Sequence, residues 1–109
     1  MQVNATQSCT LTAEQVNAAF KALASEQRRE ILRMLATCPS EPGAPCSATG
    51  EVCACKITER LNLAASTVSH HMGVLRAAGL VSARKEGTWV HYALQRDVME
   101  QVASELLGF

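Results

Sequence analysis

The sequence predicts a mainly α-helical fold with one β-hairpin, in the order α-α-α-α-β-β-α, for a chain of 109 residues. Three observations lead to this prediction. Apolar residues recur at helical spacing in segments that begin with a capping residue. Two alternating, strand-like runs late in the chain are separated by a turn that contains glycine. The closing segment, residues 97–107, returns to helical spacing. A chain of this length forms one compact domain, and domains this small commonly gain stability by pairing.

The first two helices each begin with a capping signal. Thr12 and Gln15 form a capping box for the first helix, which we expect to end near Ser25. Its apolar positions are Val16, Ala19, Phe20 and Leu23. Ser25 can cap the second helix, and Pro39 ends it. The apolar stripe of the second helix consists of Ile31, Leu32 and Leu35. The side chains expected to face water are Arg28, Arg29 and Glu30.

Residues 38–50 form a long loop that holds all three prolines of the chain. Loops of this length inside a compact domain are usually either functional or disordered. Because Cys38 and Cys46 mark the two ends of the loop, we expect it to be functional.

A helix-turn-helix follows this loop. A short helix over residues 54–61 leads into a turn at residues 62–65, and Ser66 then caps a longer helix. The apolar face of the short helix consists of Ile57 and Leu61. The inward residues of the longer helix are Val68, Met72 and Leu75. Gly79 supplies the left-handed residue that ends the longer helix.

The two strand-like runs come directly after this pair of helices. Residues 81–84 and 89–94 are joined by Lys85-Glu86-Gly87-Thr88, so the simplest prediction is a β-hairpin. A hairpin in this position is a wing, and the fold is therefore predicted to be a winged helix-turn-helix.

The closing helix is expected to pair with its copy in a homodimer. Asp97, with Glu100 three residues later, can cap this helix. Its apolar positions are Val98, Met99, Val102, Ala103 and Leu106. The chain is thus divided into an N-terminal arm, residues 1–10, and a winged helix-turn-helix domain, residues 11–109. The domain contains the cysteine-bearing loop 38–50 and a C-terminal dimerisation helix 97–107.

Composition restricts the function classes. The net charge is zero, but residues 51–96 hold six basic and three acidic side chains, whereas the last thirteen residues carry only acidic ones. A basic middle and an acidic end suit a DNA-binding face opposite a separate helical surface. We expect a cytoplasmic protein with no membrane contact, because no segment reads as a membrane span or a signal peptide. We expect neither an enzyme nor a small organic substrate, because the chain has no glycine-rich phosphate loop and no Cys-x-x-Cys motif.

The polar face of the longer helix of the pair is the candidate DNA contact. Side chains there can hydrogen-bond to base edges in the major groove of double-stranded DNA. The outward set is Thr67, Ser69, His70, His71, Val74 and Arg76. Ser66 and the helix N-terminus can hold a phosphate through backbone amides, and Arg84 and Lys85 on the wing can reach the adjacent backbone or a minor groove. Metal binding by His70 and His71 is not expected, because successive helical residues point about 100° apart.

The chain resembles the ArsR/SmtB family of bacterial metal-responsive repressors from about Val16 to Leu94. The resemblance rests on the run Ser66-Thr67-Val68-Ser69-His70-His71-Met72, on Leu75-Arg76-Ala77-Ala78-Gly79-Leu80-Val81 and on the wing Arg84-Lys85-Glu86-Gly87. It implies a homodimeric winged helix that binds a palindromic operator without ligand and releases it when metal binds. It also implies dimer contacts through the first and last helices.

Cys53 and Cys55 resemble the Cys-x-Cys metal site of this family, and Glu51-Val52 precedes them as in its arsenical-responsive members. Those members often carry a third cysteine three residues later, where this chain has Thr58. Residues two apart on an ideal helix point roughly 200° apart and cannot share an ion. Either the helix begins after Cys53, or binding unwinds its first turn. Both options link the ion to the helix that supports the DNA-contacting one.

The identity of the inducer and of its third ligand stays open. As(III) or Sb(III) would require three thiolates, and the third is expected from Cys46, then from Cys9 of the partner subunit, then from Cys38. Four thiolates would suit Zn, Cd or Pb. The alternative signal is thiol oxidation, with a disulfide between Cys46 and either Cys38 or Cys53. A zinc site on the last helix is not expected, because residues 97–109 contain no His.

Overall fold

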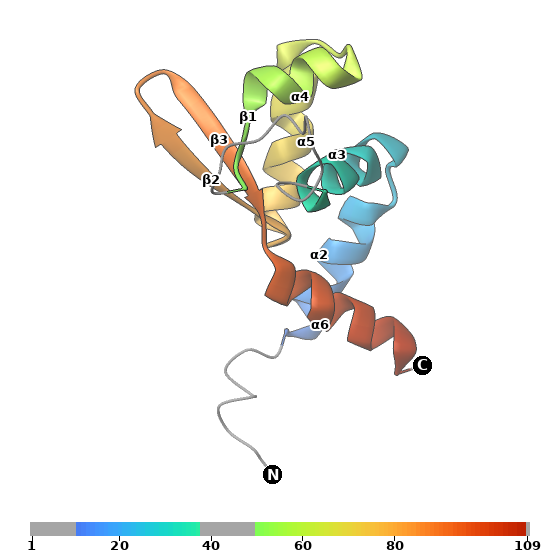
Figure 1. Ribbon diagram of the computed structural model, residues 1–109. Helices are drawn as coiled ribbons and strands as arrows, with labels where there is room; N and C mark the ends of the chain where they lie inside the picture. Colours follow the sequence, from blue (N-terminus) through green and yellow to red (C-terminus); the bar gives the residue numbers. More distant parts are fainter. Residues whose placement is uncertain (1–10, 38–49, 109) are drawn as a thin grey trace.

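The computed structural model describes residues 11–37 and 50–108. Its elements are, in chain order, α2 (Ala13–Leu23), α3 (Glu26–Ala36), β1 (Val52–Cys53), α4 (Ala54–Leu61), α5 (Ala65–Ala77), β2 (Val81–Glu86), β3 (Trp89–Leu94) and α6 (Arg96–Leu107) (Figure 1). The predicted winged helix-turn-helix is confirmed. The arm 1–10, nearly all of the loop 38–50 and its Pro39, and with them Cys9, Cys38 and Cys46, lie outside the described residues.

The caps of α2 and α3 are those the sequence predicts. The backbone N–H of Gln15 donates to Thr12 Oγ1 over 3.1 Å, and the backbone N–H of Thr12 donates to Gln15 Oε1 over 2.8 Å. This reciprocal pair satisfies two amides that the first turn leaves without helical partners. Ser25 Oγ accepts from the backbone N–H of Arg28 over 3.3 Å and begins α3. The buried residues of α3 are Ile31, Leu32, Met34 and Leu35.

Two predicted caps are wrong. The N-cap of α5 is Ala64, whose carbonyl already accepts from the backbone N–H of Val68 over 3.0 Å, so Ser66 lies within the first turn. The N-cap of α6 is Gln95, whose carbonyl accepts from the N–H of Met99 over 3.0 Å, so Asp97 also lies in the first turn. Neither helix has a side-chain cap. A carboxylate in the first turn, such as that of Asp97, still interacts favourably with the helix dipole.

The hairpin belongs to a three-stranded antiparallel sheet in the order β1-β3-β2. Its first strand, β2, extends further than predicted, because Glu86 pairs with Trp89 and only Gly87 and Thr88 form the turn; β3 has the predicted bounds. Gly87 has φ 63°, which suits the tight two-residue turns of hairpins. The third strand, β1, was not predicted. It pairs with the far side of β3, with Val52 opposite Tyr92 and Cys53 opposite His91.

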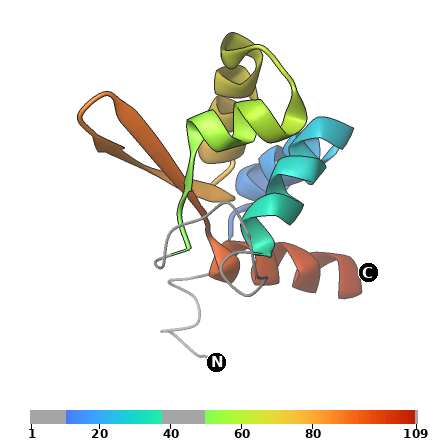
Figure 2. The ribbon, with the colours of Figure 1, turned by 45° about the horizontal axis from the view of Figure 1, so that its top comes forward.

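The core lies where α3, α5 and the base of the sheet meet. Fully buried side chains come from each of these elements and from α4, among them Ile31, Val52, Ile57 and Leu75. The hairpin projects from this body on one side, and α6 lies at the end opposite α4 (Figures 1 and 2). Arg96 Nη2 at the start of α6 donates to the Ala36 carbonyl at the end of α3 over 2.9 Å. In the described part of the chain, no helix is long and apolar enough to cross a membrane.

Candidate nucleic-acid interface and thiol site

Helix α5 has one buried and one exposed face. Val68, Met72 and Leu75 are at most 1% exposed, which confirms their predicted inward orientation. The exposed polar side chains are Ser66, Ser69, His70 and Arg76, while Thr67 and Val74 are half-buried. This exposed face therefore presents hydroxyl, imidazole and guanidinium groups, which can hydrogen-bond to base edges or phosphates. Their contact with DNA stays a prediction.

The outward orientation predicted for His71 is wrong. Its side chain is buried at 8% exposure, and its ring contacts two residues of α3. Arg28 takes part in this contact, so the prediction that its side chain faces water is wrong as well. Its guanidinium instead bends back over the end of α2 and donates to the carbonyls of Ala22 (2.7 Å) and Lys21 (3.3 Å). Helical spacing alone gave no signal for these partners, since they come from other helices.

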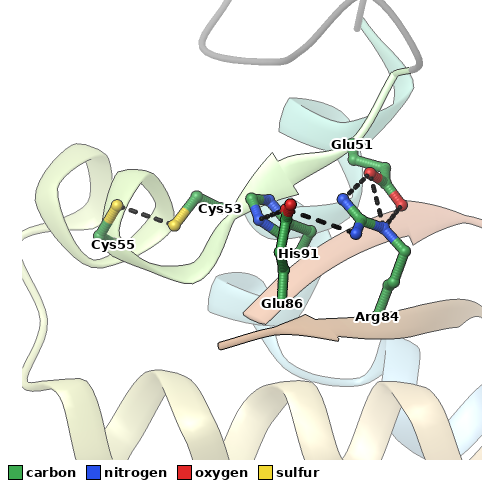
Figure 3. Close-up of polar contacts among 6 residues, drawn as sticks. All are labelled: Glu51, Cys53, Cys55, Arg84, Glu86 and His91. Atoms are coloured by element: carbon green, nitrogen blue, oxygen red, sulfur yellow. Dashed lines mark hydrogen bonds and ion pairs between the residues drawn. The ribbon is translucent and has the colours of Figure 1, made fainter. Parts of the chain in front are cut away.

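The wing carries an ion pair that joins it to the segment before β1. Arg84 Nε and Nη2 donate to the Glu51 carboxylate over 2.9 and 2.8 Å, and Arg84 Nη1 contacts Glu86 over 3.4 Å (Figure 3). Hydrogen bonding to Glu51 is the main cause that raises the pKa of Arg84 above its usual range. Lys85 is exposed. One of the two wing cations predicted to reach DNA is therefore already held by a carboxylate of this chain.

The two cysteines of the candidate metal site lie side by side. The Cys55 thiol donates to Cys53 Sγ over 2.9 Å, and the two side chains point toward each other in Figure 3. This is possible because α4 begins at Ala54, so that Cys53 is its extended N-cap residue. Of the two options that the sequence left open, the helix beginning after Cys53 is the one observed. The hydrogen bond to Cys53 is also the main cause that raises the pKa of Cys55.

The thiol pair fits part of a coordination site. A tetrahedral ion with metal–sulfur bonds of about 2.3 Å holds two thiolates about 3.8 Å apart, so the pair would open by about 1 Å. Within residues 11–37 and 50–108, no three His, Cys, Asp or Glu side chains lie close enough to hold one metal ion. Any third thiolate therefore comes from Cys46, Cys9 or Cys38, which lie outside the described residues.

Cys53 also lies at a structural junction that the sequence did not reveal. It ends β1, which is paired with the wing strand β3, and it is the N-cap of α4, which supports α5. Its register partner His91 lies 3.5 Å from Glu86, measured from Nε2 to Oε1. Cys53 therefore lies in direct connection with both the wing and the helix-turn-helix.

Known transcriptional regulators are similar to this chain in sequence. The family model described as bacterial regulatory protein, arsR family, matches residues 47–83. An uncharacterized HTH-type transcriptional regulator of Methanocaldococcus jannaschii is 37% identical, over 76% of this chain and 81% of its own. An arsenical resistance operon repressor of Bacillus subtilis is 32% identical, over 81% of this chain and 73% of its own. The arsenic resistance transcriptional regulator ArsR1 of Pseudomonas putida is 33% identical over 82% of this chain, which spans 61% of that protein's length.

Solved structures agree with these relatives. The crystal structure of an ArsR family transcriptional regulator superposes with a TM-score of 0.72, over 91% of this chain and 90% of its own, and its 21% identity supports the fold alone. The solution structure of a homodimeric winged helix-turn-helix DNA-binding domain from Mycobacterium bovis, a possible ArsR-family regulator, has a TM-score of 0.64 and 30% identity. That match covers 86% of this chain and 77% of the Mycobacterium domain.

Proposed function

This chain belongs to the ArsR family of DNA-binding transcriptional repressors, which are not enzymes, and on that premise we propose that a thiophilic ion such as As(III) or Sb(III) relieves its repression. In this proposal a homodimer binds a palindromic operator, and ion binding to Cys53 and Cys55 releases the DNA. The arsenical resistance repressors among its relatives support the class of inducer, and the homodimeric Mycobacterium domain supports the assembly.

The observation that carries the proposal is the 2.9 Å approach of the two sulfurs at the start of α4. An ion bound there would draw two thiolates into one coordination shell. Cys53 and Cys55 would hold it together with a third thiolate, for which Cys46 is the first candidate. An ion can change the affinity for DNA only if it interacts differently with the bound and free conformations. The position of Cys53 between β1 and α4 supports such a difference, because opening the sulfur pair would displace the end of β1, the start of α4, or both.

Fluorescence anisotropy tests this proposal with a double-stranded fragment selected from random sequence by the reduced wild-type protein. We expect As(III) to weaken binding by about 5- to 150-fold, the usual range for coupling between two sites. Cys53→Ser and Cys55→Ser should bind the fragment normally and no longer release it. Thr58→Ala, a change of similar size in the same helix, should keep the response. The variants Cys46→Ser, Cys9→Ser and Cys38→Ser then identify the third thiolate.

Other outcomes would contradict the assignment of the ion. Release by Cd(II), Pb(II) or Zn(II) but not by As(III) would indicate a sensor of divalent soft metals. Release by an oxidant alone, reversed by dithiothreitol, would indicate a redox switch.

A gain-of-function variant provides a further check. Thr58→Cys places a third thiol on the face of α4 that carries Cys55, since residues three apart on a helix are neighbours. It should lower the As(III) concentration needed for release.

A further inference from the structure

The inward face of α5 carries a polar contact that neither the DNA-binding face nor the thiol pair uses. The His71 ring lies between two residues of α3: its Nδ1 is 3.2 Å from Arg28 Nη1 and its Nε2 is 2.9 Å from Gln27 Oε1. His71 is the one polar or charged residue among the buried residues of the described part of the chain. A buried polar group is costly unless hydrogen-bonded, and here both ring nitrogens have partners.

These partners determine which nitrogen carries the proton. A guanidinium has only donors, so Arg28 requires His71 Nδ1 to be an unprotonated acceptor. The neutral ring then carries its hydrogen on Nε2 and donates it to Gln27 Oε1. Exchanging the side-chain oxygen and nitrogen of Gln27 would not change the assignment of Nδ1 as the unprotonated nitrogen, because Arg28 alone excludes a hydrogen there. Of the three protonation states of histidine, only the neutral Nε2–H tautomer satisfies both contacts.

The same arginine ties a third helix into the contact. Arg28 Nε and Nη2 donate to the carbonyls of Ala22 and Lys21 in the last turn of α2, where a cation is favoured by the helix dipole. His71 is thus connected through one side chain to the ends of both α2 and α3. Because successive helical residues lie about 100° apart, holding His71 against α3 also sets the direction in which His70 points.

We propose that His71 is a positioning residue for DNA binding: its neutral Nε2–H ring, held by Arg28 and Gln27, sets the rotation of α5 against α2 and α3. The proposal rests on DNA binding by the family and is independent of the thiol site. A second proton on His71 would place an N–H against the Arg28 N–H and break this contact. Acid should therefore loosen α5.

The surroundings of His71 oppose such a proton. Burial, then the positive charge of Arg28 and then the neighbouring His70 lower the pKa of His71 below its usual value near 6.5. Arg28 comes from α3 and His70 from α5 itself, while α2 contributes main-chain carbonyls to Arg28. The folded state thus binds fewer protons at this site than the unfolded chain. The contribution of this neutral ring to stability is therefore fully present above about pH 6.5 and is lost as the pH falls from there through the folded pKa.

Long-range ¹H–¹⁵N NMR on the wild-type protein reads the tautomer directly. We expect His71 to be neutral with its hydrogen on Nε2 at pH 7.5, and to take up its second proton below pH 6.5. A hydrogen on Nδ1, or a doubly protonated ring at pH 7.5, would overturn the proposal without reference to DNA.

Binding to the selected DNA fragment, followed from pH 7.5 to pH 5.0, tests the role of this contact. Positive charge added to the protein in acid should by itself strengthen DNA binding. We expect the opposite for the wild type, a loss of about tenfold or more, because the Arg28–His71 contact breaks. His71→Asn does not titrate, and its amide oxygen can still accept from Arg28. Its affinity at pH 5.0 should therefore not fall below its own affinity at pH 7.5.

Variants of the other two histidines, His70→Asn and His91→Gln, are the matched controls and should keep the loss in acid. His71→Ala removes the acceptor and should weaken binding already at pH 7.5. Circular dichroism at each pH shows whether a variant is folded. If the wild type binds equally well or better at pH 5.0, or if His71→Asn loses affinity in acid as the wild type does, the proposal is wrong.

Discussion

Gly79 ends α5 in a conformation that other residues adopt only with strain. Its φ is 80°, its N–H donates to the Arg76 carbonyl over 2.9 Å, and the next N–H, that of Leu80, donates to the Leu75 carbonyl over 3.0 Å. These two bonds form a Schellman motif. A Cβ at this position would meet its nearest neighbour, Val98 Cγ1, at 4.0 Å, so space is not the obstacle. We predict that Gly79→Ala lowers the free energy of unfolding by about 1–2 kcal/mol through strain at positive φ.

Gly73→Ala is the matched control for this prediction. Gly73 lies in the middle of α5, where a Cβ would have no atom within 4 Å. Alanine there should stabilise the protein by about 0.5–1 kcal/mol, because glycine is a poor helix former. Urea denaturation at one fixed protein concentration measures both variants, since the stability of a dimer depends on concentration. Equal effects of the two substitutions would show that the conformation of Gly79 is not strained for alanine.

For single residues, the sequence correctly predicts conformations and contacts that depend on neighbours nearby in the chain. The Thr12–Gln15 capping box and the left-handed Gly79 were predicted correctly, because their partners lie within four residues along the chain. His71 was placed on the wrong face, because its orientation depends on Gln27 and Arg28, more than forty residues away. The 2.9 Å approach of the two sulfurs also depended on where α4 begins. Spacing alone left that point open.

Among the elements, β1 is the one that the sequence analysis missed. A strand of two residues has no alternation to detect, and Val52–Cys53 is extended because it pairs with β3. The wing was predicted because its two strands are six residues long and closed by a glycine turn. This strand matters for the thiol site. Without β1, the thiol site is connected only to α4, whereas the observed sheet connects it to the wing as well.

The ion pair between the β1 segment and the wing gives a prediction for this element. Glu51 holds Arg84 over 2.8 Å, so part of the positive charge of the wing is neutralised in the free protein. Glu51→Gln should release Arg84 toward a phosphate. We predict tighter DNA binding and a steeper salt dependence, by about 0.9 in the slope of log affinity against log salt concentration for one additional phosphate contact. Anisotropy titrations from 50 to 300 mM salt, roughly the range in which such slopes are resolved, provide the measurement.

Glu59→Gln is the control for this charge change. Glu59 lies on α4, is 77% exposed and is 4.0 Å from Lys56, so its removal changes the net charge equally without freeing a wing arginine. Its salt dependence should match that of the wild type. If Glu51→Gln also leaves the slope unchanged, Arg84 does not reach the DNA backbone.

For the whole molecule, the distribution of exposed apolar side chains argues for pairing through α6. Leu107 is 88% exposed and Leu106 is 52% exposed, both in the last turn of α6. Burying a leucine contributes about 1.5–3 kcal/mol, and a two-fold interface contains each residue twice. Leu107→Asp should therefore weaken the proposed dimer by at least about a hundredfold, and with it the binding of the selected DNA fragment. Analytical ultracentrifugation measures the dimer directly.

Trp89→Ser is the control, because Trp89 is 57% exposed on the wing, away from α6, and its loss should leave the dimer intact. A Leu107→Asp protein that remains dimeric at micromolar concentration would place the interface on another surface.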